Sequence, residues 1–336
     1  MRVLVTGSAG FVGFHVASRL LEGGDEVVGV DGLTSYYDVD LKRARQARLD
    51  RFPRFRGRKF LLEDFDQLAR LLDSGFDVIY HCAAQAGVRY SLEQPRAYVE
   101  ANLVGTFNLL EAMRRSPPRH LLFASTSSIY GANRSIPFRE IDRADYPLSF
   151  YAATKKAGEE MCHAYSHLYG MPMTMLRFFT VYGPWGRPDM ALFKFVSAIL
   201  ADEPIEVFDG GKMRRDFTYV DDLVEAMLRL GSVAPKPPSD RRDEASSIDS
   251  LSSQAPWRVV NIGTGRPVLL DDFVAAVEKA CGRTARRRDM EMQAGDVPAT
   301  YANTDLLFEL TGYRPATPLA TGVEAFVDWY KSYFRV

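Results

Sequence analysis

The sequence predicts an α/β fold built on a doubly wound parallel sheet, with a smaller α/β lobe toward the C-terminus. Short β-branched apolar runs alternate with segments that are apolar at helical spacing, which is the pattern of parallel strands joined by helices. The first of these runs is followed by Gly7, Gly10 and Gly13, and then by a helical pattern. A strand, a glycine turn and a helix in this order are typical of a Rossmann-type sheet.

The first element, a strand over residues 2–6, leads into a helix that covers residues 14–21. Gly7 allows a turn that other residues resist, Gly10 lets the backbone approach a ligand, and Gly13 lets the helix pack on the strand. The second strand, residues 27–30, ends at Asp31, where a carboxylate would accept hydrogen bonds from both hydroxyls of an adenosine ribose. The turn and Asp31 together predict a dinucleotide site rather than a structural turn alone.

The elements that follow continue the alternation. A basic amphipathic segment over residues 41–54 is expected to be a mainly solvated helix. The run 59–62 predicts a third strand, with Asp64 and Phe65 beyond its carboxyl end, where ligands collect in parallel sheets and where these two side chains would bracket an adenine. The remaining elements of this half are a helix at 68–72, a strand at 77–81, a small-residue turn at 82–87, a helix at 98–115 and a strand at 121–124.

A group of hydroxyls, residues 125–128, follows the last of these strands, and Tyr151 opens a long helix that runs to Gly170. Tyr151 and Lys155 share one face of this helix because they are four residues apart. A free tyrosine has a pKa of about 10, and a neighbouring ammonium and a nicotinamide cation would both lower the pKa of Tyr151 toward neutrality. With Thr126 hydrogen-bonded to the same substrate hydroxyl, these residues predict a site that oxidises an alcohol.

The second half predicts a strand at 171–177, a turn-rich loop at 178–190, a helix at 191–200, strands at 205–208, 212–217 and 259–263, and helices at 269–281 and 321–334. We assign residues 1–178 to the dinucleotide-binding domain, with returning segments near 216–230 and 256–264. Residues 179–215 and 265–336 are assigned to the substrate lobe. Residues 231–256 lack apolar periodicity and predict a mobile surface excursion.

Composition excludes several function classes. The 336 residues are 46% hydrophobic and 25% charged, with a net charge of -1, so we expect neither a nucleic-acid nor a membrane partner. Cys82, Cys162 and Cys281 lack metal-ligand spacing and predict free thiols in a reducing compartment, with no metal site. The chain opens on a strand without a targeting pattern, and we expect a cytoplasmic protein.

Three motifs together resemble the extended short-chain dehydrogenase/reductases. They are the glycine motif, Tyr151-x-x-x-Lys155, and Arg215-Asp216-Phe217-x-Tyr219-Val220-x-Asp222. Within these enzymes the chain is most similar to the nucleotide-sugar 4-epimerases that act on UDP-glucuronate. This similarity rests on residues 85–91, residues 151–157 and above all the block 177–195, and it extends over the chain except for 231–256.

The resemblance implies an enzyme that holds NAD tightly and uses it in each turnover. Tyr151, as a phenolate, would take the proton of the sugar 4-hydroxyl while the C4 hydride passes to NAD⁺. Lys155 would hold the ribose hydroxyls and lower the pKa of Tyr151, and Thr126 stands at the position of the catalytic Ser or Thr. The 4-keto sugar would turn over and receive the hydride on its other face, giving UDP-galacturonate. The family also implies a homodimer through residues 98–115 and 151–169.

The same resemblance implies two sets of binding residues. The cofactor set is Gly7, Ala9, Gly10, Phe11, Val12, Gly13, Asp31, Asp64, Phe65, Ala83, Ala84, Gln85, Asn102, Tyr151 and Lys155. The set for the UDP-sugar is Arg89, Ser127, Ser128, Thr180, Arg187, Lys194, Val207, Phe208, Arg215 and Asp296. Arg215 is the best candidate for a phosphate contact, because a guanidinium matches two phosphate oxygens.

Ser127 and Ser128 distinguish among related activities. The resembling 4,6-dehydratases carry Asp-Glu after the threonine, and UDP-glucuronate decarboxylases carry Glu at the position of Ser128, whereas this chain has two neutral hydroxyls. Galactose-type epimerases usually have Asn at the position of Thr180 and often Arg at that of Gln293. A decarboxylase or dehydratase of the same fold stays open as an alternative, as does a non-catalytic NAD-binding regulator. One of the two serines could also serve only the turn at the strand end.

Overall fold

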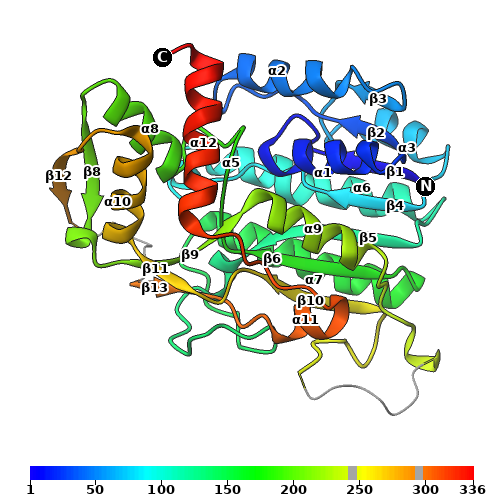
Figure 1. Cartoon of the computed structure of the whole chain (residues 1–336). Helices are drawn as coiled ribbons and strands as arrows, with labels where there is room; N and C mark the ends of the chain where they lie inside the picture. The colour runs from blue at the N-terminus through cyan, green and yellow to red at the C-terminus, as the bar shows by residue number, and fades with distance from the viewer. Residues whose placement is uncertain (241–247, 292–297) are drawn as a thin grey trace.

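The computed structural model describes residues 1–240, 248–291 and 298–336. At its centre lies a seven-stranded sheet in the order β10-β6-β5-β4-β1-β2-β3 (Figure 1). Every pairing in this sheet is parallel, which confirms the predicted Rossmann-type fold. The strands are β1 (Arg2–Thr6), β2 (Glu26–Val30), β3 (Phe55–Arg58), β4 (Val78–His81), β5 (His120–Thr126), β6 (Met173–Phe178) and β10 (Trp257–Ile262).

Helices cover both faces of this sheet, because successive strand residues point to opposite sides. On β1, Val3 and Val5 belong to one buried core, and Leu4 belongs to the other. The first face carries α1 (Phe11–Glu22), α2 (Val39–Leu49), α9 (Val220–Gly231) and α11 (Asp305–Thr311). The second carries α3 (Phe65–Leu72), α6 (Gly105–Met113) and α7 (Phe150–Tyr169).

The smaller lobe, which the sequence predicts to be the substrate lobe, lies beside the carboxyl edge of the large sheet, at the left of Figure 1. Its own core is aromatic, with Phe193, Phe273 and Phe326 packed together. The helices are α8 (Ala191–Leu200), α10 (Leu270–Cys281) and α12 (Leu319–Phe334). Two small sheets complete it: β8 (Pro204–Phe208) pairs with β12 (Arg286–Met290), while β7 (Thr180–Tyr182), β11 (Pro267–Leu269) and β13 (Ala299–Thr300) pair with β9 (Arg214–Tyr219).

The third strand lies earlier in the chain than predicted. It covers Phe55–Arg58, and residues 59–62 are irregular. The register explains the difference, because β2 ends at Val30, which pairs with Arg58. Residues 59–62 extend past the end of their only neighbour, so they have no strand with which to pair.

Three further segments differ from the sequence-based expectations. The predicted loop after residue 178 contains β7, which pairs with β9. The predicted helix at 98–115 is divided into α5 (Pro95–Tyr98), a π-helical segment (Val99–Val104) and α6, after the short helix α4 (Tyr90–Glu93). Although α11 was assigned to the substrate lobe, its Leu306 and Leu307 are buried in the core of the large sheet.

The segment predicted as a mobile excursion is fixed to the sheet at its C-terminal end. Asp249 forms an ion pair with Arg258 of β10 at 3.0 Å, and the Ser250 hydroxyl accepts a hydrogen bond from the Val259 amide. Ala255 is fully buried. Residues 248–256 therefore pack against β10, while residues 241–247 lie outside the described part of the chain.

Among the described residues, no helix is long and apolar enough to cross a membrane. No group of three or more His, Cys, Asp or Glu side chains in the described ranges is placed to hold a metal ion. Cys82, Cys162 and Cys281 are free thiols.

Candidate active site

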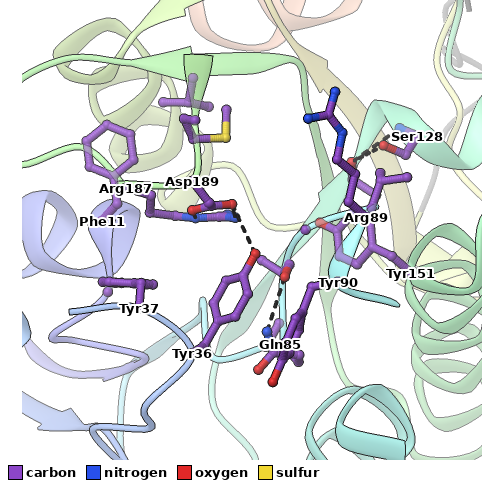
Figure 2. A pocket seen from close by; sticks show the side chains of 18 of the residues that line it. Phe11, Tyr36, Tyr37, Gln85, Arg89, Tyr90, Ser128, Tyr151, Arg187 and Asp189 are labelled. Atoms are coloured by element: carbon purple, nitrogen blue, oxygen red, sulfur yellow. Dashed lines mark hydrogen bonds and ion pairs between the residues drawn. The ribbon is translucent and has the colours of Figure 1, made fainter. Parts of the chain in front are cut away.

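A cavity of about 1250 Å³ lies between the carboxyl edge of the large sheet and the substrate lobe (Figure 2). Pockets for one small ligand are typically about 300–1,000 Å³, so this cavity has room for a dinucleotide and a second ligand together. It is lined by the glycine turn, by the ends of β2, β4 and β5, by the loop before α8, and by the lobe strands β8 and β9.

The glycine turn forms one end of the cavity. Gly7 has a φ of +72°, and a Cβ there would lie 2.8 Å from the backbone nitrogen of Ala83. A Cβ on Gly13 would lie 2.2 Å from the carbonyl oxygen of Gly7, so only glycine lets α1 approach the turn this closely. No side chain caps the start of α1, and its first N–H groups have no acceptor within the helix. This end of the cavity therefore suits an anion such as a pyrophosphate.

Asp31 lies at the end of β2 and lines the same part of the cavity. Its Oδ2 accepts a hydrogen bond from the Ala9 amide at 3.0 Å, and its Oδ1 accepts one from the Leu33 amide at 2.8 Å. Each carboxylate oxygen has a second lone pair, so both oxygens can still accept from ribose hydroxyls. Ala9, which we predicted to contact the cofactor, does not line the cavity and instead orients Asp31.

The predicted adenine contacts are displaced by the shift of the third strand. Asp64 and Phe65 are not among the residues that line the cavity; Leu61, Leu62 and Glu63 line it instead. The Asp64 carboxylate caps α3 by accepting from the Gln67 amide at 3.1 Å, and Phe65 is 40% exposed. Asp64 and Phe65 therefore form the N-terminal end of α3 and do not line the cavity.

The loop after β4 brings Ala83, Ala84 and Gln85 to the cavity wall. Asn102 lies behind this wall. Its Oδ1 accepts from the Gln85 amide at 2.7 Å, and its Nδ2 donates to the Gln85 carbonyl and to Thr154 of α7, each at 3.0 Å. Asn102 thus positions the wall residues rather than facing the cavity.

The hydroxyls of Thr126 and Tyr151 lie together in the cavity lining, where β5 ends and α7 begins. The Ser149 hydroxyl caps α7 by accepting from the Ala152 amide at 3.1 Å, which fixes the first turn that carries Tyr151. Burial raises the pKa of Tyr151 above its usual value, and the charge of Arg187 and a hydrogen bond with Thr126 offset only part of this rise. The protein alone therefore does not lower this pKa toward neutrality, as the sequence predicted it would with a bound nicotinamide cation. The hydroxyl oxygens of Thr126 and Ser128 are 3.2 Å apart, within hydrogen-bond distance.

Lys155 lies behind the cavity wall and does not line the cavity. Its Nζ is 4.3 Å from the centroid of the Phe123 ring, and the side chain is buried. Burial lowers the pKa of Lys155 to about 8. Within the described part of the chain, Arg187 rather than Lys155 is the cation that most lowers the pKa of Tyr151. The ammonium of Lys155 lies over the Phe123 ring, and its predicted effect on the pKa of Tyr151 stays a prediction.

Arg187 enters the cavity from the loop before α8 and is held by Asp189. Its Nε and Nη2 donate to Asp189 Oδ1 and Oδ2 at 3.0 and 2.5 Å. The Tyr36 hydroxyl donates to the same Oδ2 at 3.0 Å (Figure 2). Burial would raise the pKa of Asp189, but Arg187 and these hydrogen bonds lower the pKa below its usual value. The carboxylate therefore stays ionised and fixes the guanidinium.

The lobe brings five of the predicted sugar-nucleotide contacts to the opposite wall, namely Thr180, Arg187, Lys194, Phe208 and Arg215. Arg89 lies across the cleft with its guanidinium carbon 4.8 Å from the centroid of the Phe208 ring. Val207 does not line the cavity; it is 1% exposed and packs in the lobe core, since neighbouring residues of β8 point to opposite sides. Asp296 and Gln293 lie outside the described residues. The predicted residues that do line the cavity here are Arg89, Ser127, Ser128, Thr180, Arg187, Lys194, Phe208 and Arg215.

Sequence reasoning missed Tyr36, Lys42 and Asp189, all of which line the cavity. The predicted solvated helix places Arg43 and Arg48 in solvent, but Lys42 is 5% and Arg45 is 0% exposed. The available signal was their spacing, since residues three apart share a helix face. A second signal that the sequence analysis did not use was the pair of tyrosines in the loop after β2 and Asp31, Tyr36 and Tyr37.

The chain resembles proteins of known family along its whole length. Residues 3–238 match the model of the NAD dependent epimerase/dehydratase family. A probable UDP-glucuronate 4-epimerase of Rhizobium meliloti is 56% identical, over 100% of this chain and 98% of the relative. UDP-glucuronate 4-epimerase 2 of Arabidopsis thaliana is 45% identical, over 99% of this chain and 76% of the relative. The structure of UDP-glucuronic acid 4-epimerase from Bacillus cereus, in complex with UDP-glucuronic acid and NAD, is 32% identical and superposes with a TM-score of 0.87, covering 99% of this chain and 100% of that one.

Proposed function

Since the chain belongs to the NAD dependent epimerase/dehydratase family, we propose that its cavity binds NAD and a UDP-sugar together. The protein is an NAD-dependent nucleotide-sugar 4-epimerase, and its reaction is the interconversion of UDP-glucuronate and UDP-galacturonate. Relatives that share 56% and 45% of their residues with this chain are named for this activity on UDP-glucuronate.

The observation that carries the proposal is the pair of hydroxyls formed by Thr126 and Tyr151. The pair lies in one continuous cavity between the glycine turn and the lobe wall with Arg215. An open helix start and the Asp31 carboxylate at one end suit the two polar parts of NAD, its pyrophosphate and its adenosine ribose. A sugar held between the two ends would therefore present its 4-hydroxyl to Tyr151.

When bound, NAD supplies a nicotinamide ring that accepts a hydride from C4 of the sugar and returns it. The chain supplies the proton transfer at the oxygen on C4. Tyr151 accepts the hydroxyl proton, and Thr126, hydrogen-bonded to Tyr151, stabilises the phenolate and orients the same oxygen. When C4 is reduced again, Tyr151 returns the proton. Arg187 favours the phenolate through its positive charge.

Ser127 and Ser128 favour epimerisation over elimination or decarboxylation. Both line the cavity next to Thr126, and Ser128 Oγ is hydrogen-bonded to Thr126 rather than to a carboxylate. Oxidation at C4 turns a uronic acid into a β-keto acid that can lose carbon dioxide. Neutral hydroxyls from Thr126, Ser127, Ser128 and Thr180 would hold the sugar carboxylate by hydrogen bonds without supplying an acid or base. This arrangement keeps the carboxylate away from the geometry that favours its loss.

Incubation of the protein with UDP-glucuronate, followed by chromatography and mass analysis, tests this function. We expect a new UDP-sugar with the mass of the substrate and the retention of UDP-galacturonate. A product lighter by carbon dioxide would instead identify a decarboxylase, and one lighter by water a dehydratase. Bound NAD without any product would identify a non-catalytic NAD-binding protein.

We also propose that the enzyme is a cytoplasmic homodimer that pairs through residues 98–115 and 151–169. The support is apolar exposure on these helices: Val104 is 40%, Phe107 is 47% and Leu168 is 65% exposed, although large apolar side chains are usually buried. Phe107→Glu should shift the protein from dimer to monomer in light scattering coupled to gel filtration. An unchanged mass would place the interface elsewhere or show that the enzyme is a monomer.

A further inference from the structure

Arg45 of α2 is fully buried, and its hydrogen bonds go to uncharged acceptors. Its Nη1 donates to the Ala9 carbonyl at 3.0 Å and to the Tyr37 hydroxyl at 2.8 Å. Its Nη2 donates to the carbonyls of Trp185 and Gly186 at 2.6 and 3.1 Å. Within the described part of the chain, Nε is buried without a partner. A buried charge is costly unless it is well compensated, so this position calls for a functional reason.

The contacts of Arg45 join two parts of the site that are far apart in sequence. Ala9 belongs to the glycine turn, while Trp185 and Gly186 directly precede Arg187. His15 of α1 adds a third bond to this loop, because its Nε2 lies 2.9 Å from the Pro184 carbonyl oxygen. The carbonyls of three successive residues in the loop before α8, 184–186, are thus hydrogen-bonded to side chains of α1 and α2, the two helices next to the glycine turn.

The loop needs this support because its backbone is strained. Trp185 has a φ of +59°, a region that L-residues other than Asn and Gly rarely adopt. Two residues later the loop places Arg187 in the cavity, and Tyr36 holds Asp189 from the cofactor side. A strained segment persists only where its surroundings over-determine it, and here those surroundings come from the dinucleotide-binding half.

We propose that Arg45 is a positioning residue that ties the glycine turn to the loop carrying Arg187, so that the NAD site and the sugar site form one rigid unit. The inference rests on the proposed function, in which NAD must stay bound while it is reduced and reoxidised. With the tie in place, the turn and the loop cannot move apart, and NAD is released slowly. Without Arg45, the glycine turn is no longer joined to the loop, and the Arg187 side chain is no longer held in position in the cavity.

The test compares Arg45→Met and Arg45→Lys with Arg43→Met. Arg43 is a matched control, since it is on the same helix but exposed, and it forms an ion pair with Asp40 at 2.8 Å. For each purified protein we would measure the NAD content, the rate of NADH release by loss of its fluorescence in the presence of excess NAD, and kcat and KM with UDP-glucuronate. Circular dichroism would confirm that each variant is folded.

We expect Arg45→Met to release NADH at least tenfold faster, which corresponds to about 1.4 kcal/mol, and to raise KM for the UDP-sugar. Arg45→Lys should fall between, because one ammonium cannot reach all four acceptors, and Arg43→Met should match the wild type. If Arg45→Met does not fold, Arg45→Lys alone decides the question. Unchanged NADH release and KM in a folded Arg45 variant would overturn the proposal. A wild-type protein that binds NAD but forms no product would refute the function instead, and the release rates would still test the tie.

Discussion

Replacement of Asp189 by Asn should change both the stability of the loop and the pH dependence of the reaction. The Arg187 and Asp189 side chains are 20% and 28% exposed, and they form a two-bond ion pair. Loss of one partner from a fully buried pair costs about 3–5 kcal/mol, whereas an exposed pair contributes about 0–1 kcal/mol. This partly buried pair lies between these limits, so Asp189→Asn should lower the free energy of unfolding by about 2 kcal/mol.

The effect on pH dependence has a definite sign. Asp189 raises the pKa of Tyr151, because a carboxylate disfavours a nearby phenolate, whereas Arg187 lowers this pKa. Asp189→Asn should therefore lower the pKa of Tyr151, and Arg187→Gln should raise the pKa. Since Tyr151 acts as the base, activity is lost as pH falls through its pKa. The acid limb of the profile should thus move to lower pH in Asp189→Asn and to higher pH in Arg187→Gln.

The assay is kcat/KM for UDP-glucuronate across the neutral and alkaline range, with the epimer quantified by chromatography. Unfolding in denaturant gives the stability change for the same proteins. If the acid limb of the pH profile moves in the same direction in both variants, or does not move, Tyr151 is not a base whose pKa is set by Arg187 and Asp189. An unchanged stability of Asp189→Asn would refute the estimate for the ion pair alone.

Four more outcomes follow from the site. Tyr151→Phe should abolish turnover while the purified protein keeps its NAD; full activity would remove Tyr151 from the mechanism. Ser128→Glu should raise the share of UDP-pentose in the products, and an unchanged product ratio would count against a role for Ser128 in protecting the carboxylate. Glu159→Gln should lower the free energy of unfolding by about 3–5 kcal/mol, because Glu159 is fully buried and pairs with Arg177 at 2.9 Å; denaturant titration measures this. Lys155→Met should be more stable than the wild type below about pH 8 when NAD is absent, because folding lowers the pKa of Lys155 from 10.5 to about 8 and so penalises the charged form; thermal unfolding below and above this pH would contradict the prediction if the wild type were the more stable at the lower pH.

Local patterns were sufficient where a residue depends on its own strand or helix. The glycine turn and Asp31 are linked by the hydrogen bond from Ala9 to Asp31, within one βαβ unit. Tyr151 faces the cavity because it begins a capped helix. The third strand was misplaced because its limit is set by pairing with Val30 of β2. A sequence pattern shows which runs can form strands, but it does not show where a neighbouring strand ends.

The residues that sequence reasoning missed act over long separations. Tyr36 reaches Asp189 across 153 positions, and Arg45 reaches Trp185 across 140. Nothing in the composition of residues 41–54 distinguishes Arg45 from its exposed neighbours; only its spacing from Lys42 sets it apart. Lys155 was predicted to lie beside the Tyr151 phenol because the two residues share a helix face. The sequence does not show that the Phe123 ring, from a strand far along the chain, lies under the Lys155 ammonium.

The net charge of -1 led us to expect no polyanionic partner such as nucleic acid, yet it says nothing of how charge is distributed around the cavity. Arg45 and Lys155 are both buried behind its walls, and the side chains and carbonyls that contact them are mainly uncharged. Buried cations in such surroundings lower the stability of the empty protein. The ligands proposed here carry two pyrophosphates and a carboxylate, so their binding would offset part of this cost. The same charges that destabilise the empty site then favour its occupation, which suits an enzyme that keeps its cofactor through each turnover.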